Sequence, residues 1–175
     1  MKKAIVLFSL LFLVSACEKL DKLTQFNMEY NETITIPASA GIDLPFNIIT
    51  PDVDTNSEST FEINDTRKDL IEKINLKTLD LTITSPPDAD FSFLKSIKIY
   101  ISAEGLPEVK IAWKDDIPAN ANKINLEVTD RDLKDYIKAD KFKLRVETVT
   151  NELISQDHEI KVHAVFFVDA KILGI

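Results

Sequence analysis

The sequence predicts an all-β fold, an antiparallel β-sandwich with two short helices, in a single domain over residues 24–175. Apolar and polar residues alternate in many short runs, which is the period of a strand with one buried face. The runs recur at intervals of roughly 8–15 residues without a strand–helix–strand rhythm, and this favours antiparallel pairing. No repeat of roughly 20–50 residues is present, which argues against a solenoid or a propeller.

The first predicted strands lie at the N-terminal end of this domain. Residues 26–36 alternate and stop before Pro37, and residues 42–48 form a second alternating run. Pro45 lies inside the second run. Because proline cannot donate a ladder hydrogen bond, this run is predicted to be an edge strand or to contain a bulge. Residues 51–60 are almost entirely polar and predict an exposed loop.

Two short helices are predicted from capping boxes, in which a threonine and an acidic residue three positions later satisfy each other's backbone amides. The first box, Thr66 and Asp69, follows a short strand at 61–63 and opens a helix over residues 66–74 with one apolar face. The second box is Thr129 and Asp132. It opens a helix whose predicted inward residues are Leu133, Tyr136 and Ile137.

Six further alternating runs complete the predicted sheets. They are residues 79–83, 97–101, 109–113, 124–128, 142–146 and 160–168. The last run has apolar residues on both faces, with Val165 and Phe167 on its second face. This pattern predicts a central strand that is covered on both sides.

A secretory signal precedes the domain. Met1-Lys2-Lys3 is positively charged, residues 4–13 are apolar apart from Ser9, and small residues follow up to Cys17. The apolar run is about half as long as the roughly 20 residues that span a bilayer, so a permanent transmembrane helix is not predicted.

Val14-Ser15-Ala16-Cys17 resembles the lipobox of bacterial lipoproteins. The resemblance covers residues 1–17 and implies that the chain is cut before Cys17, which receives a diacylglycerol on its thiol and an acyl chain on its new amine. Residues 1–16 would then be a removed signal peptide, and residues 17–23 a lipidated cysteine with a short tether. The alternative is an ordinary signal with a chance cysteine, but Cys17 is the only cysteine among 175 residues.

The residue after the cysteine bears on the destination. In the best-known sorting rule of such lipoproteins, aspartate at that position retains the protein at the inner membrane. Glu18 stands there in this chain, and this favours the outer membrane.

Length and charge limit the partners of the mature chain. Removal of the signal leaves 159 residues and changes the formal net charge from −8 to −10, because Lys2 and Lys3 are lost. Such an acidic body repels nucleic acid and anionic membrane surfaces, so attachment to a membrane is predicted through the lipid on Cys17 alone. With its only cysteine acylated, the chain forms no internal disulfide.

From Leu79 onward, the order of elements resembles the Ig-like sandwich of late-embryogenesis-abundant domains of the WHy type. The residues that support this resemblance are a strand ending in a proline turn, Leu81-Thr82-Ile83-Thr84-Ser85-Pro86, and a later Ile117-Pro118 turn. The resemblance departs from the family at Ser85, where the family has asparagine. It implies a fold and no activity.

Asp52, Asp54 and Asn56 have the spacing of the first three ligands of a calcium loop, because alternate oxygens can converge on one hard cation. The match then fails. Ser57 replaces the glycine of the sharp turn, and Ile63 occupies the position of the bidentate glutamate. A solvated acidic stretch is therefore the favoured interpretation over a weak calcium site, and no other metal or cofactor is predicted.

The two histidines and the carboxylates give no catalytic site. His158 and His163 are five residues apart, so on a strand they face opposite sides and cannot share a metal. No Gly-x-Ser-x-Gly elbow is present. Carboxylate pairs such as Asp115-Asp116 could serve glycoside hydrolysis, but they lie at turns and caps where they have structural roles. We therefore predict that the protein is not an enzyme.

Aromatic residues offer the best candidates for a contact surface. Phe91 and Phe93 lie in a predicted connection, where they would form either an exposed tip or a plug for the open end of the sandwich; the plug is favoured. Trp113 and Tyr100 fall on the polar phase of their strands. They would form an aromatic surface for a glycan or a protein, although a buried tryptophan is the commoner arrangement.

These observations lead to three functional hypotheses. The first is a non-catalytic, lipid-anchored envelope protein that binds or supports another envelope component, a protein or a glycan. The second is a hydrolase that uses carboxylates. The third is a carrier that holds a hydrophobic ligand between its sheets.

Overall fold

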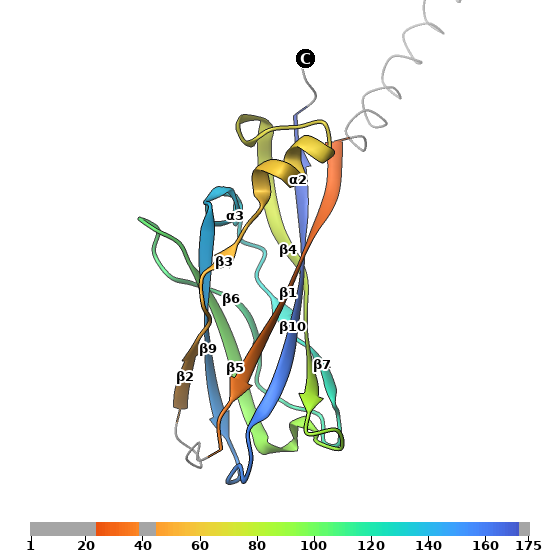
Figure 1. Cartoon of the computed structure of the whole chain (residues 1–175), viewed down its shortest axis with the longest axis vertical. Coiled ribbons are helices and arrows are strands. Elements are labelled where there is room, and N and C mark those ends of the chain that lie inside the picture. Colours follow the sequence, from red (N-terminus) through yellow and green to blue (C-terminus); the bar gives the residue numbers. More distant parts are fainter. Residues whose placement is uncertain (1–23, 39–44, 172–175) are drawn as a thin grey trace, which may run out of the picture.

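The computed structural model describes residues 24–38 and 45–171. Two antiparallel sheets face each other (Figure 1), which confirms the predicted β-sandwich. The first sheet has the strand order β1-β10-β4-β7, and the second has the order β2-β9-β5-β6-β8, with β3 paired to β9. The signal, Cys17 and the tether lie outside the described residues.

The strands of the first sheet are β1 (Gln25–Ile36), β4 (Ile71–Ser85), β7 (Lys123–Asn125) and β10 (His158–Ala170). Those of the second are β2 (Pro45–Ile49), β3 (Val53–Asp54), β5 (Leu94–Ser102), β6 (Val109–Lys114), β8 (Glu127–Val128) and β9 (Lys141–Thr150). The helices are α2 (Ser57–Ile63) and α3 (Lys134–Lys138), with 3-10 turns at Lys68–Leu70 and Phe91–Phe93.

β10 is the central strand of its sheet, as predicted, and pairs with β1 on one side and β4 on the other. Its register with β1 is unbroken from Gln25–Asp169 to Ile36–His158. Only one of its faces is covered, however. Val165 and Phe167 are half-buried on the outer face, so the prediction of a strand covered on both sides is wrong on that side.

β4 begins where a helix was predicted. Residues 66–74 contain only a 3-10 turn before β4 starts at Ile71. The register of β4 against β10 shifts at Glu72, so that Ile71 and Ile74 both point into the core although they are three residues apart. A β-bulge at this position therefore imitates the apolar spacing of a helix. The predicted capping box is absent, because Asp69 is ion-paired with Arg67 instead.

The predicted loop at 51–60 and strand at 61–63 are also wrong, because this stretch contains β3 and α2. The helix is held by Phe61, which is fully buried and contacts Phe26 edge to face at a ring-centroid distance of 6.2 Å. It ends in a Schellman motif, in which the Thr66 amide donates to the Phe61 carbonyl and the Asp65 amide donates to the Glu62 carbonyl. Asp65 adopts the left-handed conformation with φ 53°.

The run at 124–128 is two strands in two sheets. β7 pairs with β4, and after Leu126 the chain crosses over so that β8 pairs with β6. The next predicted helix is confirmed as α3, and Leu133, Tyr136 and Ile137 are buried as expected. Its cap differs from a capping box, since Asp132 accepts from the amides of Lys134 and Ile74.

The remaining predicted strands are confirmed as β5, β6, β9 and the C-terminal part of β4. β2 is an edge strand, as the proline predicted, and begins at Pro45. Residues 42–44 of that prediction lie outside the described residues. None of the helices in the described ranges is long and apolar enough to cross a membrane.

Candidate functional site

Trp113 and Tyr100 lie on the outer face of the second sheet, where both are half-buried. The position of Tyr100 follows from the alternation of β5, because Ile97, Ile99 and Ile101 point inward and are fully buried, and Trp113 of β6 lies opposite the outward Lys98. Trp113 therefore is not buried in the core and shares an outer face with Tyr100, while the predicted contact with a partner stays a prediction. We call this surface the aromatic face and define it as Lys98, Tyr100, Lys110, Trp113, Arg145 and Glu147.

A β-bulge assembles one half of this face. The register between β5 and β6 shifts between Ile99 and Tyr100, which leaves Ile111 as an extra residue. Lys110 and Trp113 would point to opposite sides of a regular strand, but the bulge brings both to the outer face. The Lys110 Nζ atom consequently lies 4.3 Å from the Trp113 ring centroid, in a cation–π contact.

Arg145 organises the other half of the aromatic face. Its guanidinium lies 4.0 Å from the ring centroid of Tyr100, its cross-strand neighbour. It also donates to both carboxylate oxygens of Glu108, from Nε at 3.1 and 2.9 Å and from Nη2 at 2.8 Å. The hydrogen bonds to Glu108 raise the pKa of Arg145 further above its usual range. This guanidinium is fixed in position as well as charged.

Glu147 connects the two halves. Its carboxylate pairs with Arg145 Nη1 at 3.2 Å and with Lys98 Nζ at 3.4 Å. Burial alone would raise the pKa of Glu147, but the hydrogen bonds from Arg145 and Lys98 outweigh it and lower the pKa. Lys98 is the register partner of Glu147 on β9 and of Trp113 on β6. An acidic, a basic and an aromatic side chain therefore form one row across β9, β5 and β6.

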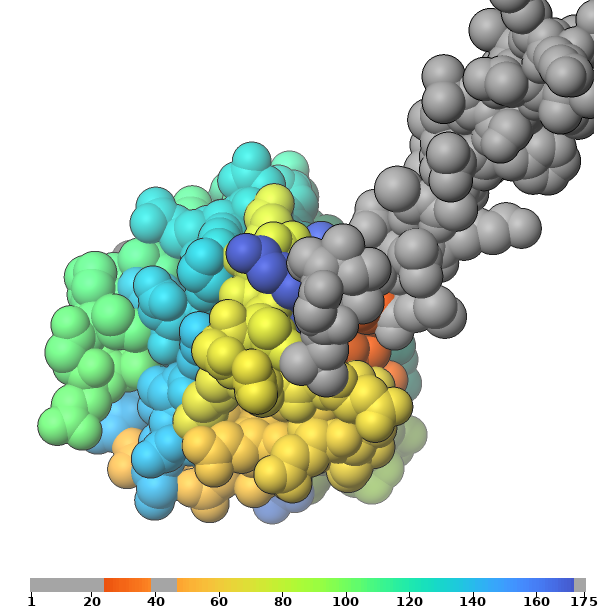
Figure 2. Space-filling model, turned by 90° about the horizontal axis from the view of Figure 1, so that it is seen from above, coloured from red at the N-terminus to blue at the C-terminus, as the bar shows by residue number. Residues whose placement is uncertain are grey.

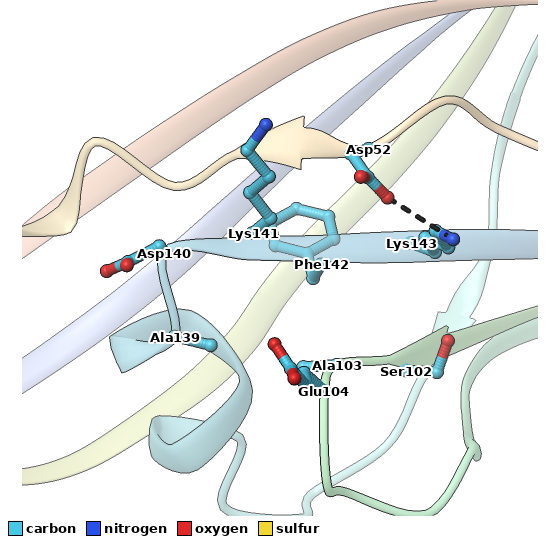
Figure 3. Close-up of a pocket in the computed structure, with 9 residues that line it drawn as sticks. All are labelled: Asp52, Ser102, Ala103, Glu104, Ala139, Asp140, Lys141, Phe142 and Lys143. Carbon is cyan, nitrogen blue, oxygen red and sulfur yellow. Dashed lines mark ion pairs between the residues drawn. The ribbon is translucent and has the colours of Figure 1, made fainter.

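A half-open pocket of about 930 Å³ lies where this sheet meets α3 (Figure 3). This volume falls in the range of about 300–1,000 Å³ that small-molecule sites occupy. The pocket adjoins the aromatic face, because Ser102 and Lys143 form the next outward pair after Tyr100 and Arg145. Its lining residues are Asp52, Ser102, Ala103, Glu104, Ala139, Asp140, Lys141, Phe142 and Lys143.

Three carboxylates line this pocket, but they do not converge. Asp52 is ion-paired with Lys143 at 3.4 Å. Figure 3 shows Glu104 on the opposite wall, pointing toward Phe142, and Asp140 pointing away from both. Asp140 is instead ion-paired with Lys68 at 3.4 Å. Within residues 24–38 and 45–171, no group of three or more histidine, cysteine or acidic side chains is suited to a metal.

The weak calcium candidate lies beside the same pocket. Asp52 and Asp54 point to the same side of a short strand, and each has a lysine partner on β9, Lys143 at 3.4 Å and Lys141 at 3.5 Å. Asn56 does not continue this extended row, because it adopts a left-handed conformation with φ 48° as the N-cap residue of α2. The pattern predicted from alternate oxygens is therefore occupied by two ion pairs.

Phe91 and Phe93 do not form an exposed tip. Both are buried in a 3-10 turn, with Phe91 fully inaccessible, and the Phe91 amide donates to the Ala121 carbonyl at 2.8 Å. The prediction of a contact surface at these two residues is wrong, and the alternative that they plug the end of the sandwich is confirmed. Phe93 also packs on His158, at a ring-centroid distance of 4.5 Å.

The two histidines lie on opposite faces of β10, as predicted. His158 is buried and its Nδ1 lies 3.0 Å from the Gln156 carbonyl oxygen. His163 is on the outer face, with Nε2 at 3.5 Å from a Glu29 carboxylate oxygen and Nδ1 at 3.9 Å from one of Asp80. They share no site.

Comparisons with known proteins identify no family. No protein-family model and no curated protein matches the chain. Among solved structures, N-glycanase F (PNGase F) is similar at 10% identity and a TM-score of 0.42, over 84% of this chain and 42% of that one. Tomato aspermy virus is similar at 13% identity and a TM-score of 0.33, over 83% and 79%.

A structure of carbohydrate-binding modules from the β-sandwich superfamily is also similar, at 13% identity and a TM-score of 0.27, over 84% of this chain and 55% of that one. The chain thus spans less than half the length of the N-glycanase that it resembles. Likenesses of this size say nothing about activity, and the assignment of the sandwich rests on the sheets themselves.

Proposed function

We propose that this chain is a non-catalytic, lipid-anchored module of the bacterial cell envelope, and that it binds another envelope component through the aromatic face. The observation that supports the binding role most directly is Trp113, a large ring half-exposed on the outer side of a sheet and flanked by Lys110 and Lys98.

The chemistry of the aromatic face suits a partner with both flat apolar and polar surfaces. Tryptophan, tyrosine and arginine are enriched at the centres of protein interfaces, and aromatic rings also offer flat surfaces for sugars. Arg145 is held by Glu108 and Glu147, so little side-chain entropy is lost when it meets a partner. The partner is a protein or a glycan of the envelope.

The anchor is supported by the sequence of residues 1–17. A lone cysteine stands at the position that the lipobox requires, and no other thiol competes for acylation. Metabolic labelling with a palmitate analogue tests this part: we expect label in the mature protein and none in the Cys17→Ala variant. Equal labelling of the two proteins would refute the anchor.

Photo-crosslinking in intact cells tests the binding face. A benzoylphenylalanine in place of Lys110 would sit on the aromatic face, and the same residue in place of Thr78 would sit on the exposed outer face of the opposite sheet. We expect a discrete adduct from position 110 that weakens in the Trp113→Ala background and persists with Phe167→Ala, the matched aromatic of the other sheet. Identical adducts from positions 110 and 78 would contradict the proposal.

Within residues 24–38 and 45–171, the apolar space between the sheets gives the carrier hypothesis no support. The enclosed apolar space there, lined by residues such as Tyr30, Leu79 and Phe166, has a volume of about 10 Å³. A space of this size holds one water molecule at most, and an acyl chain would not fit.

A carboxylate hydrolase is the second candidate, because Asp52 and Glu104 line one pocket, although their carboxylates do not converge and Asp52 is ion-paired with Lys143 (Figure 3). Incubation of the purified protein with isolated envelope glycans, followed by mass spectrometry of the soluble products, tests it. Release of fragments by the natural protein but not by Asp52→Asn or Glu104→Gln would establish hydrolysis and replace our first proposal.

A further inference from the structure

Three large apolar side chains are exposed in the described residues, and they lie in different parts of the molecule. Ile63 is 81% exposed, Leu153 is 69% exposed and Ile49 is 66% exposed. Ile63 is the last residue of α2, Leu153 lies in the turn between β9 and β10, and Ile49 ends the edge strand β2. The turn with Leu153 is at the end of the sandwich opposite α2 (Figure 1).

Ile63 lies at the end of the sandwich where β1 begins. β1 starts at Gln25, and its next residue, Phe26, packs against Phe61 of α2. The end of β10 is at the same place, since the Lys171 amide donates to the Leu70 carbonyl at 2.7 Å. Figure 2 looks down on this surface, where α2 and the residues after it lie beside the end of β10.

The length of the tether restricts which end can reach a membrane. Eight peptide units separate Cys17 from Gln25, and even a fully extended chain of that length spans no more than about 29 Å. β10 has 13 residues and is therefore about 40 Å long. A bilayer that holds Cys17 therefore lies within about 29 Å of the start of β1, at the α2 end. If the strands point away from the membrane, the turn with Leu153 lies about 40 Å farther out, beyond the reach of the tether.

Several of the charges around α2 are paired, although the exposed Glu62 and Asp65 on either side of Ile63 have no ion pair in the described structure. Glu58 is ion-paired with Lys68 at 3.1 Å, and Asp69 is ion-paired with Arg67 at 2.8 Å. Near the end of β10, Glu72 lies 3.6 Å from the Lys171 ammonium. Paired charges of both signs make this end less repulsive to an anionic lipid surface than the net charge of the chain suggests.

We propose that the α2 end of the sandwich rests on the lipid surface and that Ile63 enters the headgroup region of the bilayer. This inference builds on the proposed lipidation of Cys17 and adds the orientation of the domain. The sandwich then stands with its strands pointing away from the membrane. The turn with Leu153 is its most distant part.

A fluorescent reporter at each exposed apolar position tests the orientation. Because Cys17 would be acylated, Ile63→Cys, Leu153→Cys and Ile49→Cys each introduce the only free thiol, which can be labelled with the environment-sensitive dye NBD. All three positions are exposed, so the substitutions spare the core. The labelled, lipidated proteins are reconstituted into vesicles of phosphatidylethanolamine and phosphatidylglycerol, and flotation is measured beside the fluorescence.

We expect all three proteins to float with the vesicles, with a several-fold rise in NBD emission and quenching by nitroxide lipids only at position 63. Equal, water-like emission at all three positions in floating protein would overturn the orientation and leave the anchor intact. Failure to float would overturn the anchor itself. A rise at position 153 or 49 that exceeds the rise at position 63 would show that another surface meets the bilayer.

Discussion

The Tyr30 hydroxyl donates a 2.7 Å hydrogen bond to the backbone carbonyl of Thr55, which ties the edge strand of one sheet to the segment that leads from the other sheet into α2. The ring of Tyr30 meets Phe142 and Phe166 edge to face, at centroid distances of 5.5 and 5.6 Å. Burial raises the pKa of this phenol well above its usual value of 10.0. Tyr30 thus closes one open side of the sandwich.

Tyr30→Phe should destabilise the protein by about 1–2 kcal/mol, because the ring contacts remain while the Thr55 carbonyl loses its partner. Urea unfolding followed by circular dichroism measures the change. Thr33→Val, an exposed substitution on the same strand, is the control. A loss no larger than that of the control would show that water replaces the hydroxyl at no cost.

The same residue should make stability fall at alkaline pH. The pKa of Tyr30 is higher in the folded state than in the unfolded state, so above about pH 10 the folded protein binds more protons than the unfolded chain, and its stability decreases as the pH rises. Below pH 10 this contribution is fully present. Unfolding curves at pH 9 and pH 11 should therefore differ more in the natural protein than in Tyr30→Phe, and equal differences would contradict the assignment.

Thr148→Val should stabilise the protein. Thr148 is fully buried on the inner side of β9, and its hydroxyl has no hydrogen-bond partner in the described structure. Valine has nearly the same shape and removes the desolvated oxygen, which costs about 1–3 kcal/mol when unsatisfied. Thermal unfolding would show a higher Tm. A lower Tm would mean that a buried water serves the hydroxyl.

Arg145→Lys should lower the free energy of unfolding by about 1 kcal/mol, which is more than an arginine-to-lysine exchange on the surface normally costs. Lysine cannot make the bidentate contact to Glu108 or stack on Tyr100 in the same way. Denaturant titration gives the loss. Raising the ionic strength should shrink the difference only partly, since the stacking is not screened like an ion pair. Complete disappearance in high salt would assign the whole effect to Coulomb attraction.

Asp65→Gly should stabilise the end of α2 by a few tenths of a kcal/mol up to about 1 kcal/mol, because glycine adopts the left-handed conformation without strain. Asp65→Val should have the opposite sign, since a β-branched residue is poorly accommodated at positive φ. Chemical unfolding of the pair gives both values. Equal stabilities for glycine and valine would show that the backbone relaxes away from this conformation.

Calcium should leave the protein unchanged. Asp52 and Asp54 already have lysine partners, so a cation would have to displace both ammonium groups. We expect no shift of Tm when millimolar calcium is added, which covers the range of even the weakest extracellular sites. A rise that disappears in Asp54→Asn would revive the calcium hypothesis.

Period-two patterns predicted the strands well because one face of each sheet is buried and the other is exposed to solvent. One error arose where a bulge changes this period. At Glu72 in β4, the extra residue puts Ile71 and Ile74 on one side, and a spacing of three was interpreted as a helix. At Ile111 in β6, a second bulge brings Lys110 to the outer face of the sheet, beside Trp113. A bulge has no distinctive residue type here, so the sequence does not reveal it.

α2 was missed for a different reason. Its sequence, Ser-Glu-Ser-Thr-Phe-Glu-Ile, has a single buried aromatic residue and no apolar period, and it becomes helical because Phe61 docks beside Phe26. Such tertiary contacts override local propensity. The pocket was equally unpredictable, since Asp52, Glu104 and Lys143 come from three separate segments. Period two alone would put Trp113 on the buried side with Ile111, and it reaches the outer face because of the bulge between them.

The unbroken ladder between β1 and β10 would have a mechanical consequence if the chain is held at Cys17 as we propose. Pulling the body away from the membrane would load β1 along its own axis, so that the hydrogen bonds of its 12 residues would bear the force together and not one after another. Shear of this kind resists far greater force than unzipping does. β1, the strand nearest the lipid, would then keep the sandwich folded while the bound envelope component moves.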